Sequence, residues 1–415
     1  MTSSGSELRR TLGVGDAVVV GLGSMVGAGI FAALAPAARA AGSGLLPGLA
    51  VAAVVAYCNA ASSARLAALY PASGGTYVYG RERLGEFWGY LAGWSFVVGK
   101  TASCAAMALT VGAYVRPDQA HAVAVAAVVA LTAANYGGVR KSAWLTRAIV
   151  AVVLAVLASV VVVCLGSGEA GAGRLDLGAP DGAGLLQAAG LLFFAFAGYA
   201  RIATLGEEVR DPARTIPRAI PLALGIALAV YACVAVAVLS VLGPDGLGEA
   251  TAPLADAVRA AGVPGLAPVV RAGAAVAALG SLLALILGVS RTTLAMAKDR
   301  HLPGALAVVH PRFRVPHRAE LAVGAAVAVL AATVDVRGAI GFSSFGVLAY
   351  YAVANASAWT LDSAPVARVV PAVGLVGCVV LAFSLPGVSV VVGAGVLAVG
   401  AAAYGARRWA AGRRT

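Results

Sequence analysis

Charged residues are scarce in this sequence. Only 12% of the 415 residues are Asp, Glu, Lys or Arg, whereas 60% are hydrophobic and the mean hydropathy is +0.90. A soluble chain of this length keeps a large wetted exterior, so it cannot hide that much apolar surface. The composition therefore excludes a soluble protein and favours a chain that uses the lipid bilayer as its solvent. Spans of ~20 residues each would leave short loops and no room for a second, soluble domain.

Cysteine and histidine are also scarce, with five and four residues. The cysteines lie far apart in separate apolar runs, which is neither a disulfide framework nor a metal-ligand spacing, and we interpret them as packing residues. The histidines fall at predicted helix ends or in loops. We therefore expect no metal and no cofactor. An intramembrane enzyme would need a cluster of His, Asp or Glu within the spans, and we find none in the sequence.

The apolar runs predict about twelve transmembrane helices, with ends uncertain by several residues. The predicted spans are Gly13–Ala38, Leu46–Leu69, Leu84–Val115, His121–Tyr136, Trp144–Leu165, Gly184–Gly206, Ala219–Leu242, Val263–Ala297, Arg318–Val334, Ala339–Thr360, Val366–Leu385 and Val388–Ala406. A short surface helix is also predicted at Leu302–Val309, in the basic loop before the ninth span.

The net charge of +12 is spread over alternate loops. It is therefore an orientation signal, and we expect no nucleic acid partner. With both termini inside, 20 of the 30 Lys and Arg residues fall in inner segments and six fall in outer ones. This bias predicts a multi-pass protein of the cell membrane with both termini in the cytoplasm. The N-terminus has no A-x-A cleavage pattern before the first apolar run, so we expect a cytoplasmic tail.

The first predicted span contains four glycines, Gly21, Gly23, Gly27 and Gly29, within nine residues. Each costs a helix about 1 kcal/mol relative to alanine. Two interpretations are open. The glycines allow close packing of neighbouring helices, or they break the helix at Gly27-Ala28-Gly29, so that unwound amides bind a carboxylate near the bilayer midplane.

A second glycine, Gly198, interrupts the sixth predicted span among aromatic residues. It lies five spans after the first break. A five-plus-five inverted repeat places its two broken helices at equivalent positions, so the pairing favours the discontinuous helix and indicates a substrate site between the two breaks.

Several motifs resemble those of the amino acid–polyamine–organocation permease superfamily, in matching order over almost the whole chain. They are Gly27-Ala-Gly-Ile-Phe31, Phe194-Ala-Phe-Ala-Gly-Tyr199, Glu207-Glu208, Pro212-Ala-Arg-Thr-Ile-Pro217 and Ser290-Arg-Thr-Thr-Leu-Ala-Met-Ala-Lys-Asp-Arg-His-Leu-Pro303. The resemblance implies an all-α polytopic membrane protein with a LeuT-like fold. Helices 1–5 (residues 13–166) and helices 6–10 (184–360) would form the inverted repeats. Residues 366–406 would form two peripheral helices, and residues 1–12 and 407–415 the tails.

The resemblance also implies a substrate site on the two broken helices. The amides of residues 26–30 would bind the substrate carboxylate, and the carbonyls of Phe194, Ala195 and Ala197 would bind its ammonium group. Aromatic rings of helix 6 would cover the substrate, while helices 3 and 8 would line the pocket. The candidate substrate-binding residues are Val26, Gly27, Ala28, Gly29, Ile30, Ser103, Phe194, Ala195, Phe196, Ala197, Gly198 and Ser281.

Two features of some relatives are missing. The acidic residue two positions after the helix 6 glycine is replaced by Ala200, and no lysine occurs midway along helix 5. Lys100 lies instead ~20 Å along the third span. An ionisable residue that deep costs roughly 2.5–3.5 kcal/mol and is a functional-site hypothesis. We predict that Lys100 is a coupling group. The alternative is a structural lysine paired with backbone carbonyls.

Arg201 has two interpretations. It either faces an inner vestibule and pairs with Glu207 or Glu208, or it lies in the site and favours an acidic substrate. These three residues and Arg210 are the predicted gate. Asp16, at the inner end of the first span, is expected to pair with a loop arginine.

We therefore expect a secondary transporter that moves amino acids by alternating access. The lack of a site carboxylate favours neutral over cationic side chains, and coupling to H⁺ or exchange is favoured over coupling to Na⁺. Acidic amino acids, and amines or polyamines, are alternative substrates. A non-transporting sensor is a further alternative, against which the lack of a cytoplasmic output domain argues. The sequence gives no prediction of oligomeric state.

Overall fold

The computed structural model describes residues 12–70, 74–138, 143–175, 181–203, 209–361 and 364–412. Almost all of them lie in helices. These ranges hold no strand, and their β-type pairing is an isolated bridge between Leu12 and Val209. Helices satisfy their own backbone hydrogen bonds, which a bilayer core without water demands. Within the described ranges, eleven segments are long and apolar enough to cross a membrane, and the 17-residue helix α14 occupies the place of the ninth predicted span. The predicted all-α polytopic fold is confirmed.

Most helix ends agree with the predicted spans within a few residues. The first span is divided into α1 (Val14–Met25), α2 (Ala28–Ala32) and α3 (Leu34–Ala41), and the next four are α4 (Leu45–Leu69), α6 (Glu86–Val115), α7 (Ala120–Tyr136) and α8 (Ala143–Gly166). The sixth comprises α9 (Gly182–Phe196), η4 (Ala197–Tyr199) and α10 (Ala200–Ala203). The others are α11 (Pro212–Glu249), α13 (Ala267–Lys298), α14 (His317–Thr333), α15 (Val336–Trp359), α16 (Pro365–Ser384) and α17 (Gly387–Gly412).

Three features differ from the prediction. Helix α11 is longer than predicted at both ends. It begins at Pro212, where a proline has no helical hydrogen bond to lose, and it continues past a kink at Gly243, which has φ +70°. The sequence does not predict α5 (Thr76–Leu84) and α12 (Pro253–Ala260), because both are too short to form an apolar run. The predicted surface helix after residue 301 is reduced to η6 (Gly304–Ala307).

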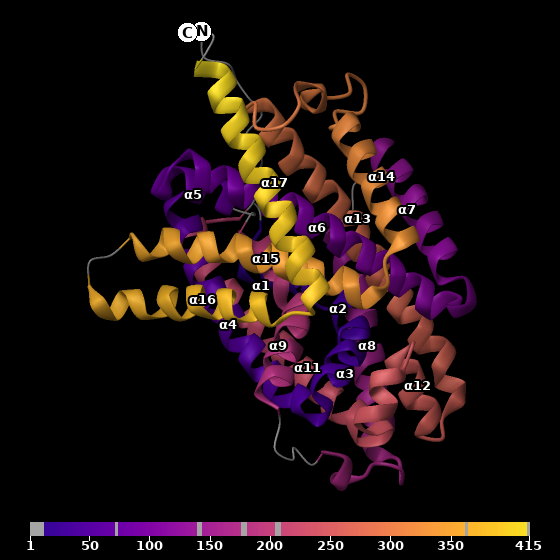
Figure 1. Cartoon of the computed structure of the whole chain (residues 1–415). Helices are drawn as coiled ribbons and strands as arrows, with labels where there is room; N and C mark the ends of the chain where they lie inside the picture. Colours follow the sequence, from indigo (N-terminus) through magenta and orange to yellow (C-terminus); the bar gives the residue numbers. More distant parts are fainter. Residues whose placement is uncertain are drawn as a thin grey trace.

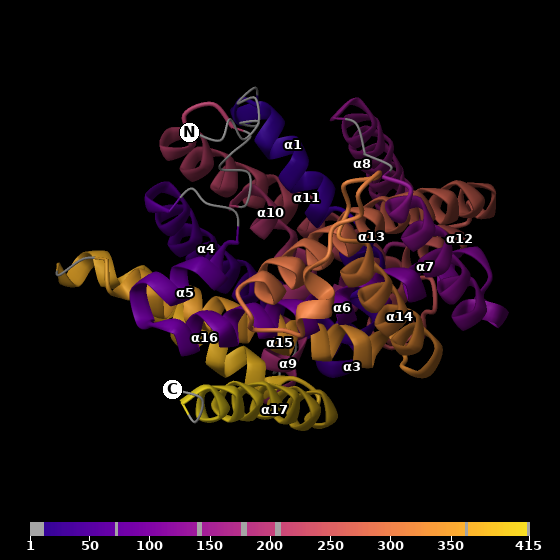
Figure 2. The same cartoon turned by 90° about the horizontal axis from the view of Figure 1, so that it is seen from above.

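The helices form one bundle with two ends (Figure 1). Helix α17 finishes at the top of that view, where α13 connects to α14, and we name this the C-terminal end. Helix α12 lies at the opposite end, which we name the α12 end. All five residues of α2 are buried at the centre of the bundle. Helix α17 lies along one edge of the bundle (Figure 2), where Val391 and Val399 are 73% and 64% exposed, as expected for a lipid-facing surface.

Candidate functional site

The first predicted break is present. Helix α1 ends at Met25, and α2 begins at Ala28 with Gly27 as its N-cap and no side-chain cap. The first amides of a helix have no partner inside it. Of the amides predicted at residues 26–30, that of Val26 donates to the Leu22 carbonyl at 2.7 Å, whereas within the described ranges no backbone carbonyl accepts from the amides of residues 27–30. Four adjacent buried amides are thus left for another acceptor.

The second predicted break lies against the first. Helix α9 ends at Phe196, and a single 3₁₀ turn leads into α10. A Cβ atom at Gly198 would overlap the carbonyl group of Ser24 and lie 2.7 Å from the Met25 amide nitrogen, and one at Gly29 would lie 2.6 Å from the Ala195 Cα. The two broken helices therefore pack backbone to backbone. The glycines accompany helix breaks and also allow this close approach, whereas carboxylate binding by the unwound amides stays a prediction.

Tyr231 of α11 connects the two breaks, and the sequence analysis did not identify it. Its hydroxyl lies 2.6 Å from the Met25 carbonyl oxygen and 3.0 Å from that of Ala195, and its ring lies 5.2 Å from the ring of Phe196. One hydroxyl proton thus serves two acceptors. A tyrosine midway along an apolar helix is the signal that could have revealed it, because a buried Tyr hydroxyl needs a partner.

Lys100 reaches the second break from α6. The side chain is 7% exposed, and Nζ donates to the Ala197 carbonyl oxygen at 3.2 Å. No carboxylate in the described ranges forms an ion pair with it. This conformation therefore matches the structural alternative, in which the lysine donates to a backbone carbonyl. Its position beside the break leaves the coupling hypothesis open.

The three carbonyls predicted to bind an ammonium group already have donors. The Phe194 oxygen accepts from the Ala197 amide, the Ala195 oxygen from Tyr231, and the Ala197 oxygen from Lys100. A carbonyl oxygen has two lone pairs, so a ligand ammonium must share these acceptors or displace the present donors.

The two predicted serines differ in position. A Cβ atom at Gly27 would lie 2.9 Å from the Ser281 Cβ, and the Ser281 hydroxyl donates weakly to the Gly23 carbonyl at 3.4 Å. Ser281 of α13 therefore lies at the first break. The Ser103 hydroxyl lies 2.5 Å from the Ser343 hydroxyl of α15, so it joins α6 to α15.

The site is closed to solvent. Val26, Ile30 and Phe194 are 3%, 2% and 7% exposed, while Ala28 and Phe196 are fully buried. A ligand can reach the free amides only if the surrounding helices move.

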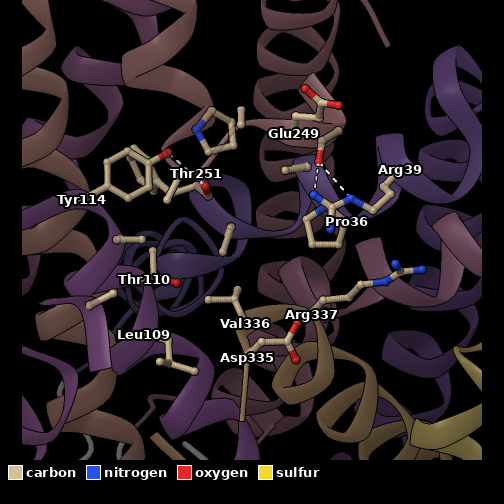
Figure 3. Close-up of a pocket in the computed structure, with 18 of the residues that line it drawn as sticks. Pro36, Arg39, Leu109, Thr110, Tyr114, Glu249, Thr251, Asp335, Val336 and Arg337 are labelled. Atoms are coloured by element: carbon tan, nitrogen blue, oxygen red, sulfur yellow. Dashed lines mark hydrogen bonds between the residues drawn. The ribbon is translucent and has the colours of Figure 1, made fainter. Parts of the chain in front are cut away.

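A cavity of about 350 Å³ approaches the first break from the α12 end (Figure 3). Phe31 of α2, the residue after Ile30, is one of its lining residues. Arg39 donates from Nε and Nη2 to the Gly248 carbonyl at 3.1 and 2.8 Å, and the Tyr114 hydroxyl donates to the Phe31 carbonyl at 3.0 Å. These contacts tie α3 to the end of α11, and α2 to α6.

At the C-terminal end, α1 is tied to two other elements. Asp16 forms an ion pair with Arg147 of α8, which confirms the expected arginine partner but places it on a helix. The Arg210 amide donates to the Leu12 carbonyl at 2.9 Å, beside the bridge to Val209. Of the other predicted gate residues, Arg201 is exposed on α10, while residues 207 and 208 lie outside the described ranges.

Residues 16–403 match the amino acid permease family. The chain belongs to this family. The permease is thus a multi-pass membrane transporter and not an enzyme, and its fold is LeuT-like. The resemblance seen in the motifs is confirmed.

The relatives of this permease agree on transport and differ in substrate. An uncharacterized transporter of Mycobacterium tuberculosis is 78% identical over 405 residues, which cover 97% of this chain and 92% of the relative. A branched-chain amino acid permease of Bacillus subtilis is 24% identical over 94% of this chain and 91% of its own length. Human cationic amino acid transporter 4 is 30% identical over 83% of this chain and 59% of its own length.

Proposed function

We propose that this permease carries neutral amino acids across the cell membrane by alternating access and couples their movement to protons. The observation that carries the proposal is the set of free, buried amides at residues 27–30, packed against a second helix break. Backbone amides recognise the carboxylate that all amino acids share. A site built from them binds the common part of the substrate and leaves the side chain to neighbouring helices.

Charge supports a neutral side chain. The Lys100 ammonium group lies on the Ala197 carbonyl, and a second cation ~5 Å away would be repelled by about 3 kcal/mol at an effective dielectric constant near 20. Every amino acid brings one ammonium group to this region, and a cationic side chain adds a further charge to be repelled, which disfavours cationic amino acids and polyamines relative to neutral amino acids. One observation favours acidic amino acids as the second candidate. Lys100 is buried without an ion-pair partner in the described ranges, and a substrate side-chain carboxylate would supply one.

The contacts at the two ends support alternating access. The cavity at the α12 end is lined by Phe31 of α2, the helix that follows the first break. At the C-terminal end, the Asp16–Arg147 ion pair and the backbone contacts of Leu12 hold the start of α1 against its neighbours. These contacts keep this end of the bundle closed. From the charge bias of the loops, we infer that the C-terminal end faces the cytoplasm.

Lys100 supports proton coupling. Protonated Lys100 and the substrate ammonium group compete for the Ala197 carbonyl, so binding of one disfavours the other. Such reciprocal linkage between two ligands makes transport depend on pH.

The test uses purified full-length protein in proteoliposomes. Uptake of labelled leucine and alanine is compared with that of lysine, putrescine and glutamate, with and without a pH gradient. We expect uptake of the neutral amino acids. Lysine uptake equal to leucine uptake would refute the charge argument, and uptake of glutamate alone would establish the second candidate.

The coupling role is tested separately with Lys100→Met. Lys298→Met, at an exposed lysine at the end of α13, is the matched control. We expect only Lys100→Met to flatten the pH profile of uptake. A Lys100→Met protein with wild-type uptake and pH profile would exclude coupling through Lys100.

A further inference from the structure

A second cavity, of about 500 Å³, lies at the C-terminal end and has no part in the site described above. It is formed by residues at the start of α6, just after the end of α13 and near the end of α17. Its lining residues are Glu86, Tyr90, Arg300, His301, Tyr404, Arg407 and Arg408.

Aromatic side chains give this cavity a packed wall. The Tyr90 ring lies 5.0 Å from that of Tyr404 and 5.4 Å from that of His301. The Tyr77 hydroxyl donates to Asp299 at 2.6 Å and accepts from Nδ1 of His301 at 2.8 Å. Tyr90 and Tyr404 are buried, so this wall is in place before any ligand binds.

The charge of the cavity is predominantly positive. Three arginines line it against one carboxylate, that of Glu86. The nearby Asp299 is already paired with Arg81 at 3.3 Å. No ion pair in the described ranges involves the lining arginines. Guanidinium groups bind phosphate through two parallel hydrogen bonds, so the arrangement is suited to a phosphate anion.

Arg300 occupies an unusual backbone position. Its φ is +60°, and the amides of His301 and Leu302 both donate to the Met296 carbonyl, which closes the end of α13. Glycine is the usual residue at such a position, because a side chain is disfavoured there. The Arg300 carbonyl also accepts from Nη1 of Arg407 at 2.9 Å. This disfavoured backbone thus joins two of the lining arginines, and strain of this kind clusters at binding sites.

Exposed tryptophans on two of the helices that form the cavity indicate that it lies near the lipid headgroups. Trp88 at the start of α6 and Trp409 near the end of α17 are 45% and 62% exposed. Exposed tryptophans gather at the membrane–water interface. Helix α17 also lies at the edge of the bundle, where lipid can approach (Figure 2).

We propose that this cavity binds the phosphate group of an anionic phospholipid from the leaflet at the C-terminal end. The guanidinium groups of Arg407 and Arg408 hold the phosphate, and Arg300 closes the cavity from α13. Basic pockets between membrane helices are suited to such headgroups. A bound lipid links the peripheral helix α17 to α6 and α13, and it stabilises the folded protein by mass action.

The test measures the thermal unfolding of delipidated, full-length protein in detergent. Dioctanoyl phosphatidylglycerol is titrated, with dioctanoyl phosphatidylcholine and inorganic phosphate as comparison ligands. Arg407→Gln/Arg408→Gln removes two lining charges. Arg312→Gln/Arg318→Gln removes two exposed charges that do not line the cavity.

We expect phosphatidylglycerol to raise Tm in the wild type and in the control variant. The Arg407→Gln/Arg408→Gln protein should need about tenfold or more lipid for the same rise, because it loses charge-assisted hydrogen bonds. An equal response in both double variants, or an equal rise with phosphatidylcholine, overturns the proposal. An equal rise in Tm with inorganic phosphate would show that the cavity binds free phosphate and not the phosphate group of a lipid. If the lining double variant fails to fold, Arg408→Gln alone provides the same comparison.

Discussion

Replacing Gly198 with alanine tests whether the two helix breaks must remain in contact. The added Cβ would overlap the Ser24 carbonyl and lie 2.7 Å from the Met25 nitrogen, whereas ordinary Cβ contacts begin near 3.4 Å. All of these atoms belong to the backbone, so the end of α1 must retreat by about 0.7 Å or more. Overpacking of this kind costs about 1–3 kcal/mol.

The outcome depends on which conformations carry this strain. If it falls only on the conformation described here, 1–3 kcal/mol reduces its population by about 5–150-fold relative to the others. Uptake should then fall about fivefold or more. If every conformation carries the same strain, Tm falls and uptake survives. Tm and initial uptake rate in proteoliposomes, measured on the same preparation, separate the two cases.

Gly225→Ala is the matched control. Gly225 lies inside α11, and a Cβ there would have no neighbour within 4 Å. Alanine favours a helix over glycine by about 1 kcal/mol, so this variant should keep wild-type uptake and an equal or higher Tm. A Gly198→Ala protein that matched the wild type in both uptake and Tm would show that the breaks do not pack as described.

Three further predictions concern other parts of the molecule. Asp16→Asn and Arg147→Gln should each weaken closure of the C-terminal end by about 0.2–1 kcal/mol, because the two side chains are 32% and 55% exposed. The effects of the two substitutions on uptake should not add in the double variant, and full additivity would argue against the ion pair. Burial lowers the pKa of His301, so the folded protein favours the neutral ring; Tm should fall as the pH drops below about 6.5, and His301→Gln should reduce this fall, whereas an unchanged slope would exclude His301 as its origin. Neither carboxylate oxygen of the buried Glu320 has a hydrogen-bond partner among the described residues, so Glu320→Gln should keep or raise Tm; a drop of several degrees would show that a negative charge is required there.

The spans were predictable because a bilayer imposes a length of about 20 apolar residues on each helix. Both breaks were predictable because glycine is the poorest helix former after proline. Their mutual contact followed from the five-plus-five spacing. The sequence did not predict helices α5 and α12, because both are too short to span a bilayer and too short to show a helical period of apolar residues.

The partners of individual polar groups were not predictable. Tyr231 is visible in the sequence as a tyrosine in an apolar run, but its two acceptors belong to residues 206 and 36 positions away. The contact of the Ser103 hydroxyl with a residue 240 positions away was likewise not predictable, and its place in the pocket stays a prediction. Such contacts depend on how the helices rotate about their axes, and the spacing of apolar residues constrains that rotation only loosely in helices that are apolar on every side.

The backbone groups at the two helix breaks of the proposed site differ in whether they have hydrogen-bond partners. This difference separates the residues that determine substrate affinity from the residue that determines proton coupling. Buried backbone groups need partners. The carbonyls of the second break have them, in Tyr231 and Lys100, whereas the amides of residues 27–30 have no backbone acceptor. A substrate carboxylate therefore meets donors that no backbone group occupies. Its ammonium group must instead compete with the lysine for a carbonyl. On this argument, changes at the first break alter substrate affinity at every pH, and a change at Lys100 alters how affinity depends on pH.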